Sequence, residues 1–459
     1  MTANPDHGFE ERCLSPDLRP TRVRWRIMAL IALVNMLPSL GKINLGVAAT
    51  YLQTEFRFSA ATMGWILGVF VFSYAIFQLP AGVAGDRYGS ARVLTVAILW
   101  YSLFLAAMAL VPQLPTTRWV GLASSFAIVQ VLVGAGEGFT PPNSAKIVGA
   151  WMSTGKLGFG ISFTTLGIGG GGALTPMFIA WTMERWGWQT SFWLSGIIGV
   201  LVAVAWGLYV TDRPEKHPGV NAAELSLIHP RAEVEHRVQT RNPNVGRPPW
   251  GTILSSASVW SLLLSYSCRA YTLYFFNTSF FIYLVRARGL TIMRGGVWGA
   301  APFFAILLLS PIGGLVSDTA VRRLGKRRGR QTAVWIGMAC SAILVLVGCN
   351  SSNNAAAILL VAAGAGFNMF ANVTWWATCI DMTPTYAASL SGLMNMCGGL
   401  AGGFAPVLTA YISSSFGWPI ALDFIAVLSL LAGSLWFFVK ADENLEEKSV
   451  RGLGDQYAR

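Results

Sequence analysis

The chain has 459 residues, of which 54% are apolar and 12% charged, and its mean hydropathy is +0.52. Soluble domains usually carry about 25% charged residues, so this composition excludes an ordinary soluble protein. The net charge of +12 does not indicate nucleic-acid binding, because the basic residues fall in short segments between apolar runs, where membrane topology explains them.

Apolar runs of about 20 residues, the length at which a helix crosses a bilayer, recur along the whole chain. They predict an all-α membrane protein with twelve transmembrane helices. The predicted spans lie at about 27–50, 62–84, 91–111, 120–142, 157–181, 190–211, 258–284, 297–317, 331–349, 355–380, 386–413 and 418–439. The first run is too long for the core of a signal peptide, so we expect it to remain as the first span.

Polar segments mark the limits of two helix bundles. We predict an N-terminal tail at 1–26, a first bundle at 27–211, a linker at 212–257, a second bundle at 258–439 and a C-terminal tail at 440–459. The linker is rich in Pro, Asn, Arg and Glu, a composition typical of a connection outside the membrane.

Positive charge predicts the side on which the termini lie. An even number of spans puts both termini on one side, which also holds Arg19, Arg22, Arg24, Arg26, Arg87, Arg92 and the run RRLGKRRGR at 322–330. Because positively charged loops stay in the cytoplasm, we expect cytoplasmic termini in a plasma or bacterial inner membrane. The turn after the seventh span opposes this assignment, since it holds Arg286, Arg288 and Arg294.

Two motifs repeat along the chain with almost the same offset. GVAGDRYG ends the second span and GLVSDTAVRRLG ends the eighth, so Asp86 and Asp318 are 232 residues apart. GWQTSF enters the sixth span and GWPIALDF the twelfth, so Gly187 and Gly417 are 230 residues apart. This agreement predicts two six-helix bundles repeated in the same orientation.

Neither the cysteines nor the glycine runs indicate a cofactor site. The six cysteines form no CxxC pair, and five lie in or beside apolar runs, so we interpret them as small core residues. The run GIGGGG at 167–172 permits close helix approach, but no Lys-Ser/Thr follows it as in a phosphate loop. We expect no metal, no cofactor, no nucleic-acid partner and no enzyme activity, because no nucleophile–base set is visible.

Four segments resemble one family of transporters. They are SYAIFQLPAGVAGDRYG at 73–89, PEKHPGVNAAELSLI at 214–228, NLGVAA at 44–49 and GLMNMCGGLAGGFAPVLTAYI at 392–412. The chain, over about residues 25–440, resembles the major facilitator superfamily, and within it the anion:cation symporter branch. The resemblance implies alternating access to a central site lined by helices one, four, seven and ten. It also implies a small organic anion, such as a sugar acid or another carboxylate, coupled to protons or sodium.

Two cations lie inside predicted spans, where ionisable groups are rare and are functional hypotheses by default. Lys42 is in the first span, where the resemblance implies an acid–Arg pair; Gly41-Lys42 keeps the cation and lacks the acid. Arg269, in SYSCRAYTLYFF, needs a carboxylate or phosphate partner. We expect both to bind the anion, the alternative for each being a long side chain that reaches the membrane surface.

Glu137 lies within an apolar run, in QVLVGAGEGFTPP at 130–142. The resemblance implies that it titrates in proton coupling, and burial favours this role because it disfavours the charged carboxylate. The alternative is a permanent salt bridge. Gln130 lies two turns earlier on the same helix face, where relatives often have Arg. We expect it to contact substrate, or else to form a polar contact between helices.

The resemblance adds further candidate residues. It implies that Tyr74 faces the cavity and that Asn395 contacts substrate, and Gln78 lies one turn after Tyr74. In the tenth span Asn372 and Trp376 share a face, and the indole offers a surface for a ring. Conformational gating residues, which hold the inward side shut through charge pairs and helix-end contacts, are predicted at helix ends: Asp86, Arg87 and Asp318.

The sequence therefore predicts a secondary active importer of an organic anion, coupled to protons and acting as a monomer in a lipid bilayer. An antiporter of phosphate esters is favoured by the two intramembrane cations. Efflux of amphipathic compounds is favoured by the aromatic residues and by Gln130 in place of an arginine. A membrane receptor is disfavoured, since the loops offer no signalling domain.

Overall fold

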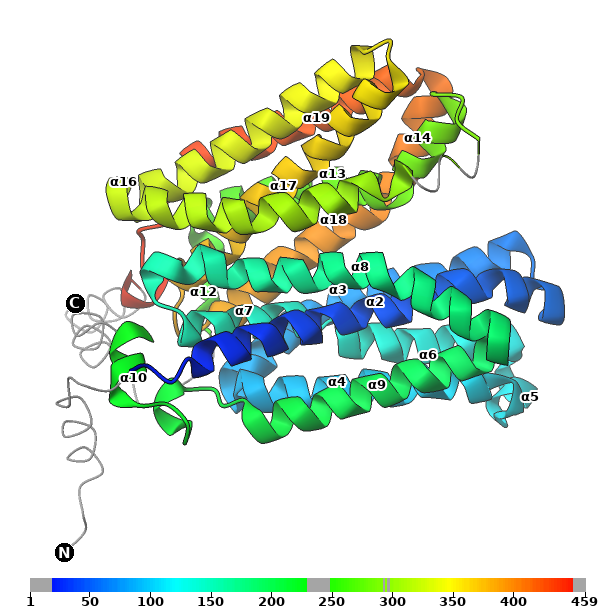
Figure 1. Ribbon diagram of the computed structural model, residues 1–459, viewed down its shortest axis with the longest axis horizontal. Coiled ribbons are helices and arrows are strands. Elements are labelled where there is room, and N and C mark those ends of the chain that lie inside the picture. The colour runs from blue at the N-terminus through cyan, green and yellow to red at the C-terminus, as the bar shows by residue number, and fades with distance from the viewer. Residues whose placement is uncertain (1–18, 229–247, 292–293, 295–297, 449–459) are drawn as a thin grey trace, which may run out of the picture.

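The computed structural model describes residues 19–228, 248–291, 294 and 298–448. These residues are nearly all helical and form two bundles that lie side by side (Figure 1). The first bundle contains α2 (Val23–Phe56), α3 (Ala60–Tyr88), α4 (Ser90–Ala107), α6 (Leu122–Glu137), α7 (Thr140–Trp151), α8 (Leu157–Trp186) and α9 (Trp188–Tyr209). The second contains α13 (Ala257–Thr278), α14 (Phe280–Arg286), α16 (Ala301–Asn350), α17 (Asn354–Met382), α18 (Ala387–Ser415) and α19 (Trp418–Ser434).

The prediction of twelve membrane-spanning segments is confirmed. Ten helical segments of the described chain are long and apolar enough to cross a membrane, and one of these, α16, contains two spans that meet at Gly325. Gly325 has φ +79°, a backbone conformation that residues with a Cβ rarely adopt. Glycine at this position therefore permits the chain to turn back between the two spans. The twelfth is α13 continued by α14, whose polar residues lower its mean hydropathy.

The fourth span is longer than predicted and is broken near its middle. The sequence indicates its end at 142, whereas α7 continues the path of α6 to Trp151. Pro141 and Pro142 have no N–H to donate to the carbonyl groups of the preceding turn, which explains the break after α6. Glu137 is therefore the last residue of α6 and lies inside the span.

The two bundles meet through small residues. α3 packs against α18, and α8 packs against α16, both across the bundle interface. A Cβ added at Gly82 would overlap the backbone of Ala388, and one added at Gly314 would come within 2.6 Å of the Gly158 carbonyl oxygen. Side chains at these glycines would separate the helices. The bundles converge at the end where α2 begins, which we call the terminal side (Figure 1).

The segments outside the bundles pack more closely than tails and linkers usually do. α2 begins at Val23, four residues before the predicted boundary. In the linker, α10 (Ala222–Ile228) carries Glu224, which is fully buried and accepts hydrogen bonds from the backbone N–H groups of Val23 and Arg24. After the last span, Ala441 and Leu445 are fully buried. The linker thus caps the start of the first span, as carboxylates do at helix N-termini.

One arginine of the turn after the seventh span has a structural role. Arg288 donates to the Tyr283 hydroxyl (2.6 Å) and to the carbonyl groups of Gly348, Cys349 and Ser351, at the end of α16. A cation is stabilised at the negative end of a helix. This local function explains one of the three positive charges that opposed the predicted topology.

Candidate functional site

Glu137 lies in the interior of the first bundle. Its side chain is fully buried, and neither carboxyl oxygen has a hydrogen-bond partner among the described residues. One carboxyl oxygen lies against the backbone of α2 at Gly41, where an added Cβ would overlap it. The predicted alternative of a permanent salt bridge does not fit this structure. Because an unpaired charge is costly to bury, these surroundings accept the neutral, protonated carboxyl.

Lys42, the next residue on α2, has an aromatic neighbour instead of an acidic one. Its Nζ lies 4.4 Å from the ring centroid of Tyr74 and 5.6 Å from that of Phe70, both on α3. The side chain is exposed, and no carboxylate of the described chain lies within ion-pair distance. Cation–π contacts of this kind hold an ammonium group in place and leave its charge available to an anion.

Arg269 is buried in the middle of α13, so the alternative of a membrane-surface arginine does not fit. The side chain is 2% exposed. Its Nε donates to Asn368 Oδ1 at 3.0 Å and its Nη1 to Asn372 Oδ1 at 2.6 Å. Both partners are neutral amides, and within the described ranges no carboxylate pairs with this guanidinium. Arg269 is therefore a buried positive charge without a counter-charge in the described part of the chain.

A chain of hydrogen bonds connects the two bundles near these cations. The Tyr266 hydroxyl donates to Asn395 Oδ1 at 2.8 Å, and the Asn395 amide donates to Gln78 Oε1 across the interface between α18 and α3. Tyr74 lies beside both amides. The Gln78 amide nitrogen is buried and has no partner in the described part of the chain.

The structure thus joins most of the predicted substrate residues in one region. Trp376 packs edge-on against Tyr266, with ring centroids 6.2 Å apart, so it belongs to the same set. Gln130 is buried two turns before Glu137 on α6 but does not donate to it. Among the predicted substrate residues, Gln130 is the one for which the structure gives no contact with another member of the set.

Sequence reasoning did not select three residues that belong to this region. Tyr266 lies one helical turn before Arg269, whose Cζ is 5.0 Å from the Tyr266 ring centroid. Asn368 lies one turn before Asn372 and binds the same guanidinium. Tyr274 lies within electrostatic range of both Lys42 and Arg269. Helical spacing on either side of Arg269 would have found Tyr266, whereas the influence of Lys42 on Tyr274 depends on how the two bundles pack.

The acidic residues at the helix ends make reciprocal contacts between the bundles. Asp86, in α3, accepts from the backbone N–H groups of Ala388 and Ser389 at the start of α18 (3.3 and 2.8 Å). Asp318, in α16, accepts from those of Gly158 and Phe159 at the start of α8 (2.8 and 2.9 Å). Each bundle therefore supplies a carboxylate to a helix N-terminus of the other.

Basic residues complete these contacts on the terminal side. Lys146 Nζ lies 2.6 Å from the Asp86 carboxylate and donates to the Thr385 carbonyl, while Arg330 Nη1 lies 3.5 Å from Asp318. Glu446, beyond the last span, accepts from the backbone N–H groups of Thr385 and Tyr386. Arg87 is not brought to these contacts: it is exposed and lies over the ring of its neighbour Tyr88 at 5.2 Å.

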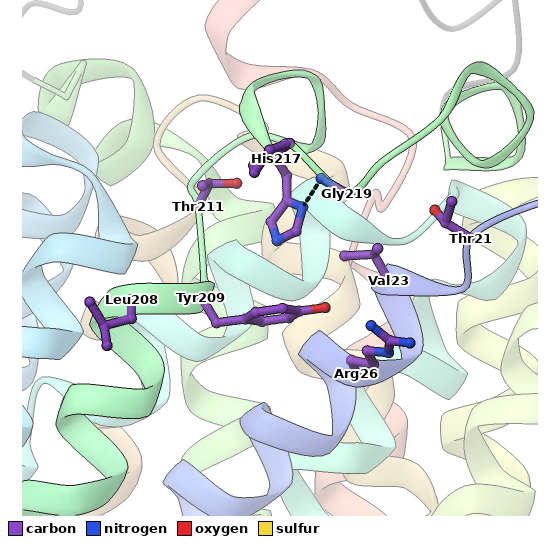
Figure 2. Close-up of a pocket in the computed structure, with 9 residues that line it drawn as sticks. Thr21, Val23, Arg26, Leu208, Tyr209, Thr211, His217 and Gly219 are labelled. Carbon is purple, nitrogen blue, oxygen red and sulfur yellow. Dashed lines mark hydrogen bonds between the residues drawn. The ribbon is translucent and has the colours of Figure 1, made fainter.

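A separate pocket of about 520 Å³ lies between the start of α2, the end of α9 and the linker (Figure 2). His217 of PEKHP lines it, and its Nδ1 accepts from the Gly219 N–H at 3.0 Å while its ring packs against Tyr209 and Trp151. None of the predicted substrate residues lines the pocket. Its walls come from the first bundle and the linker, so it is distinct from the region between the bundles.

The chain is similar to known proteins over nearly its whole length. A family model described as Major Facilitator Superfamily matches residues 31–406. The chain is 28% identical over 442 residues to the "Probable galactarate/D-glucarate transporter GudP" of Escherichia coli K12, covering 94% of this chain and 97% of that protein. It is 27% identical to the "D-galactonate transporter" of Escherichia coli O6:H1, covering 92% and 97%.

Two solved structures have the same fold. The proton:xylose symporter XylE, bound to 6-bromo-6-deoxy-D-glucose, aligns with a TM-score of 0.71 at 18% identity and covers 92% of this chain and 98% of its own. FucP in the outward conformation aligns with a TM-score of 0.66 at 14% identity, covering 91% and 100%. At these identities the likeness concerns the fold alone.

Proposed function

The chain belongs to the major facilitator superfamily, and from this premise we propose that it imports a small organic anion, a sugar acid or another carboxylate, together with a proton. Members of this family are transporters and not enzymes. Import by alternating access requires a site reached from either side in turn, built by both bundles. A single chain supplies both bundles, so we propose that it acts as a monomer.

The observation that carries this proposal is the pair of cations without acidic partners. Lys42 comes from the first bundle and lies over the Tyr74 ring, whereas Arg269 comes from the second and lies over the Tyr266 ring; Tyr266 is joined to the first bundle by the hydrogen bonds of Asn395 with Gln78. A carboxylate between them would compensate both charges and accept the bidentate hydrogen bonds that a guanidinium offers. Hydroxyl groups of a sugar acid would match the amides of Gln78 and Asn395. The relatives, which include a probable galactarate/D-glucarate transporter and a D-galactonate transporter, favour the same substrate class.

The coupling ion proposed here is a proton carried by Glu137. A carboxyl that is buried without partners is stable when protonated, and it can release the proton once the transport cycle exposes it to water. Glu137 contacts α2 at Gly41, and the next residue on α2 is Lys42. An anion bound at Lys42 and a proton on Glu137 would therefore influence each other's affinity. Two structural neighbours, XylE and FucP, are proton symporters, which favours the same coupling ion.

A thermal-shift screen of the purified protein tests the substrate class. Galactarate, D-galactonate, aromatic acids, dicarboxylates and phosphate esters would be compared at equal concentration, because only a compound that binds the folded state raises the melting temperature. Stabilisation by sugar acids or other carboxylates is the expected result. Stabilisation by phosphate esters alone would replace the proposal with an antiporter of phosphate esters, which the unpaired arginine also favours.

Alternating access further requires a gate, and we propose that Asp86 and Asp318 close the terminal side. Asp86→Asn keeps the side-chain size but weakens the carboxylate contacts with the start of α18. We expect faster labelling of the buried Cys379 by a water-soluble maleimide, measured by mass spectrometry. Arg87→Ala is the matched control, because Arg87 is adjacent and exposed. Equal labelling rates in Asp86→Asn and the parent protein would contradict this role.

We also propose that the terminal side is cytoplasmic, in a plasma or bacterial inner membrane. The arginine-rich tail and the segment 322–330 support this orientation. Reporter fusions after Gly219 and after Ser351 should therefore report opposite sides, the first of them cytoplasmic. An external position for the fusion after Gly219 would invert the topology and turn the proposed import into export.

A further inference from the structure

We propose that Gly41 is a positioning residue: the absence of its side chain lets the Glu137 carboxyl rest against α2, and this contact sets the pH range of transport. The inference depends on the proposed role of Glu137 as the proton carrier. It adds a second residue, on a different helix, that determines how this carrier meets its surroundings.

The geometry at Gly41 is specific. An ideal Cβ built there would overlap Glu137 Oε1, and it would lie 3.6 Å from Glu137 Cδ and 3.7 Å from Val133 Cγ1. The carboxyl therefore occupies the space that any other residue at position 41 would need. Gly46, five residues later on the same helix, has no atom within 4 Å of its ideal Cβ. The tight contact is a property of Gly41 and not of glycines on α2 in general.

Three ionisable groups face Glu137 from the helices around it. Lys42 lies on α2, Tyr74 on α3 and Tyr101 on α4, and each interacts with it electrostatically. The Tyr101 hydroxyl is buried and does not hydrogen-bond to Glu137. Of these groups only Lys42 is cationic, and in this conformation it lies over the Tyr74 ring instead of pairing with Glu137.

A methyl group at position 41 would displace the carboxyl from this contact. The new methyl group would also lie 3.7 Å from Val133 Cγ1, and Lys42, the next residue on α2, is the cation nearest in sequence. A displaced carboxyl would gain access to that ammonium group or to water, and both favour the carboxylate. Gly41→Ala should therefore need more acidic conditions to protonate Glu137.

The test uses N,N′-dicyclohexylcarbodiimide, which reacts with protonated carboxyl groups in apolar surroundings. Labelling of Glu137 in the full-length protein would be measured by mass spectrometry as a function of pH, without any substrate. We expect Gly41→Ala to shift the pH of half-maximal labelling downward by about one unit or more, and Gly46→Ala to leave it unchanged. Coincident profiles for Gly41→Ala and the parent protein would overturn the inference.

A second variant keeps the test decisive if Gly41→Ala does not fold. The overlap predicts that shortening the acid, in Gly41→Ala with Glu137→Asp, restores folded protein, and failure to restore it would count against the proposal. Failure of the proposed proton-carrier function and failure of the inference about Gly41 give different results. If Glu137→Gln still accumulates galactarate uphill while the labelling shift occurs, the proton-carrier function fails and the positioning contact stands. If Glu137→Gln is uncoupled and the labelling profiles coincide, only the inference about Gly41 fails.

Discussion

Glu137→Gln should abolish uphill accumulation of substrate driven by a pH gradient, while binding and counterflow exchange remain. Glutamine imitates the protonated carboxyl, which is the form that the buried, unpartnered position accepts. A carrier fixed in that form can still change conformation with substrate but cannot release a proton. For one proton per cycle, a gradient of one pH unit supports about tenfold accumulation, because it contributes about 1.4 kcal/mol. The variant should show none of this accumulation.

The measurement is uptake of radiolabelled galactarate into proteoliposomes, with and without a pH gradient, followed by exchange at equal pH. Glu55→Gln provides a matched control, since Glu55 is on α2 far from Lys42 and binds the Trp188 indole N–H, which an amide oxygen also accepts. Accumulation by Glu137→Gln at the level of the parent protein would exclude Glu137 as the coupling residue.

Removal of either cation should greatly weaken substrate binding. Truncating one partner of a buried, hydrogen-bonded charge pair costs about 2–5 kcal/mol, or roughly 30-fold to several thousand-fold in affinity. We expect the larger loss for Arg269→Ala, because Arg269 is 2% exposed and its neighbours are neutral. Arg269→Lys keeps the charge but not the planar fork, so it should lose less affinity than Arg269→Ala.

Binding would be measured by calorimetry on variants whose melting temperatures show that they are folded. Arg87→Ala removes an exposed positive charge outside the site and should leave affinity unchanged. Normal transport by both Lys42→Ala and Arg269→Ala would disprove the anion site and favour efflux of neutral amphipathic compounds.

The sequence predicts the helices well because membrane insertion requires long apolar runs with internal hydrogen bonds. It predicts the seventh span least directly, since the residues that lower its hydropathy, such as Tyr266 and Arg269, are those that form the candidate site. Rarity of charge inside the membrane was enough to select Lys42, Glu137 and Arg269 as candidates. Their protein partners were not predictable, because rarity carries no information about the facing helix.

Contacts between distant parts of the chain account for most of what the sequence did not reveal. Asp86 binds the N–H groups of residues 388 and 389, more than 300 positions away, and no local pattern in either segment encodes that pairing. Glu446 lies in a segment whose polarity predicted a free tail, yet it binds the turn before α18. The interaction of Glu137 with Gly41 was likewise invisible, because a missing side chain leaves no chemical signal in a sequence.

If Asp86 and Asp318 close the terminal side as proposed, their reciprocal contacts have a consequence for the kinetics of the transport cycle. Each joins a carboxylate to a helix end and is worth on the order of 1 kcal/mol, so either one alone would hold the bundles together only briefly. Once one has formed, the other meets its partner at high effective concentration, so the pair closes cooperatively. Cooperative closure from individually weak bonds gives a two-state latch that is firm when complete and opens without a large barrier. Disrupting one carboxylate should therefore weaken both contacts, although the two lie on different helices.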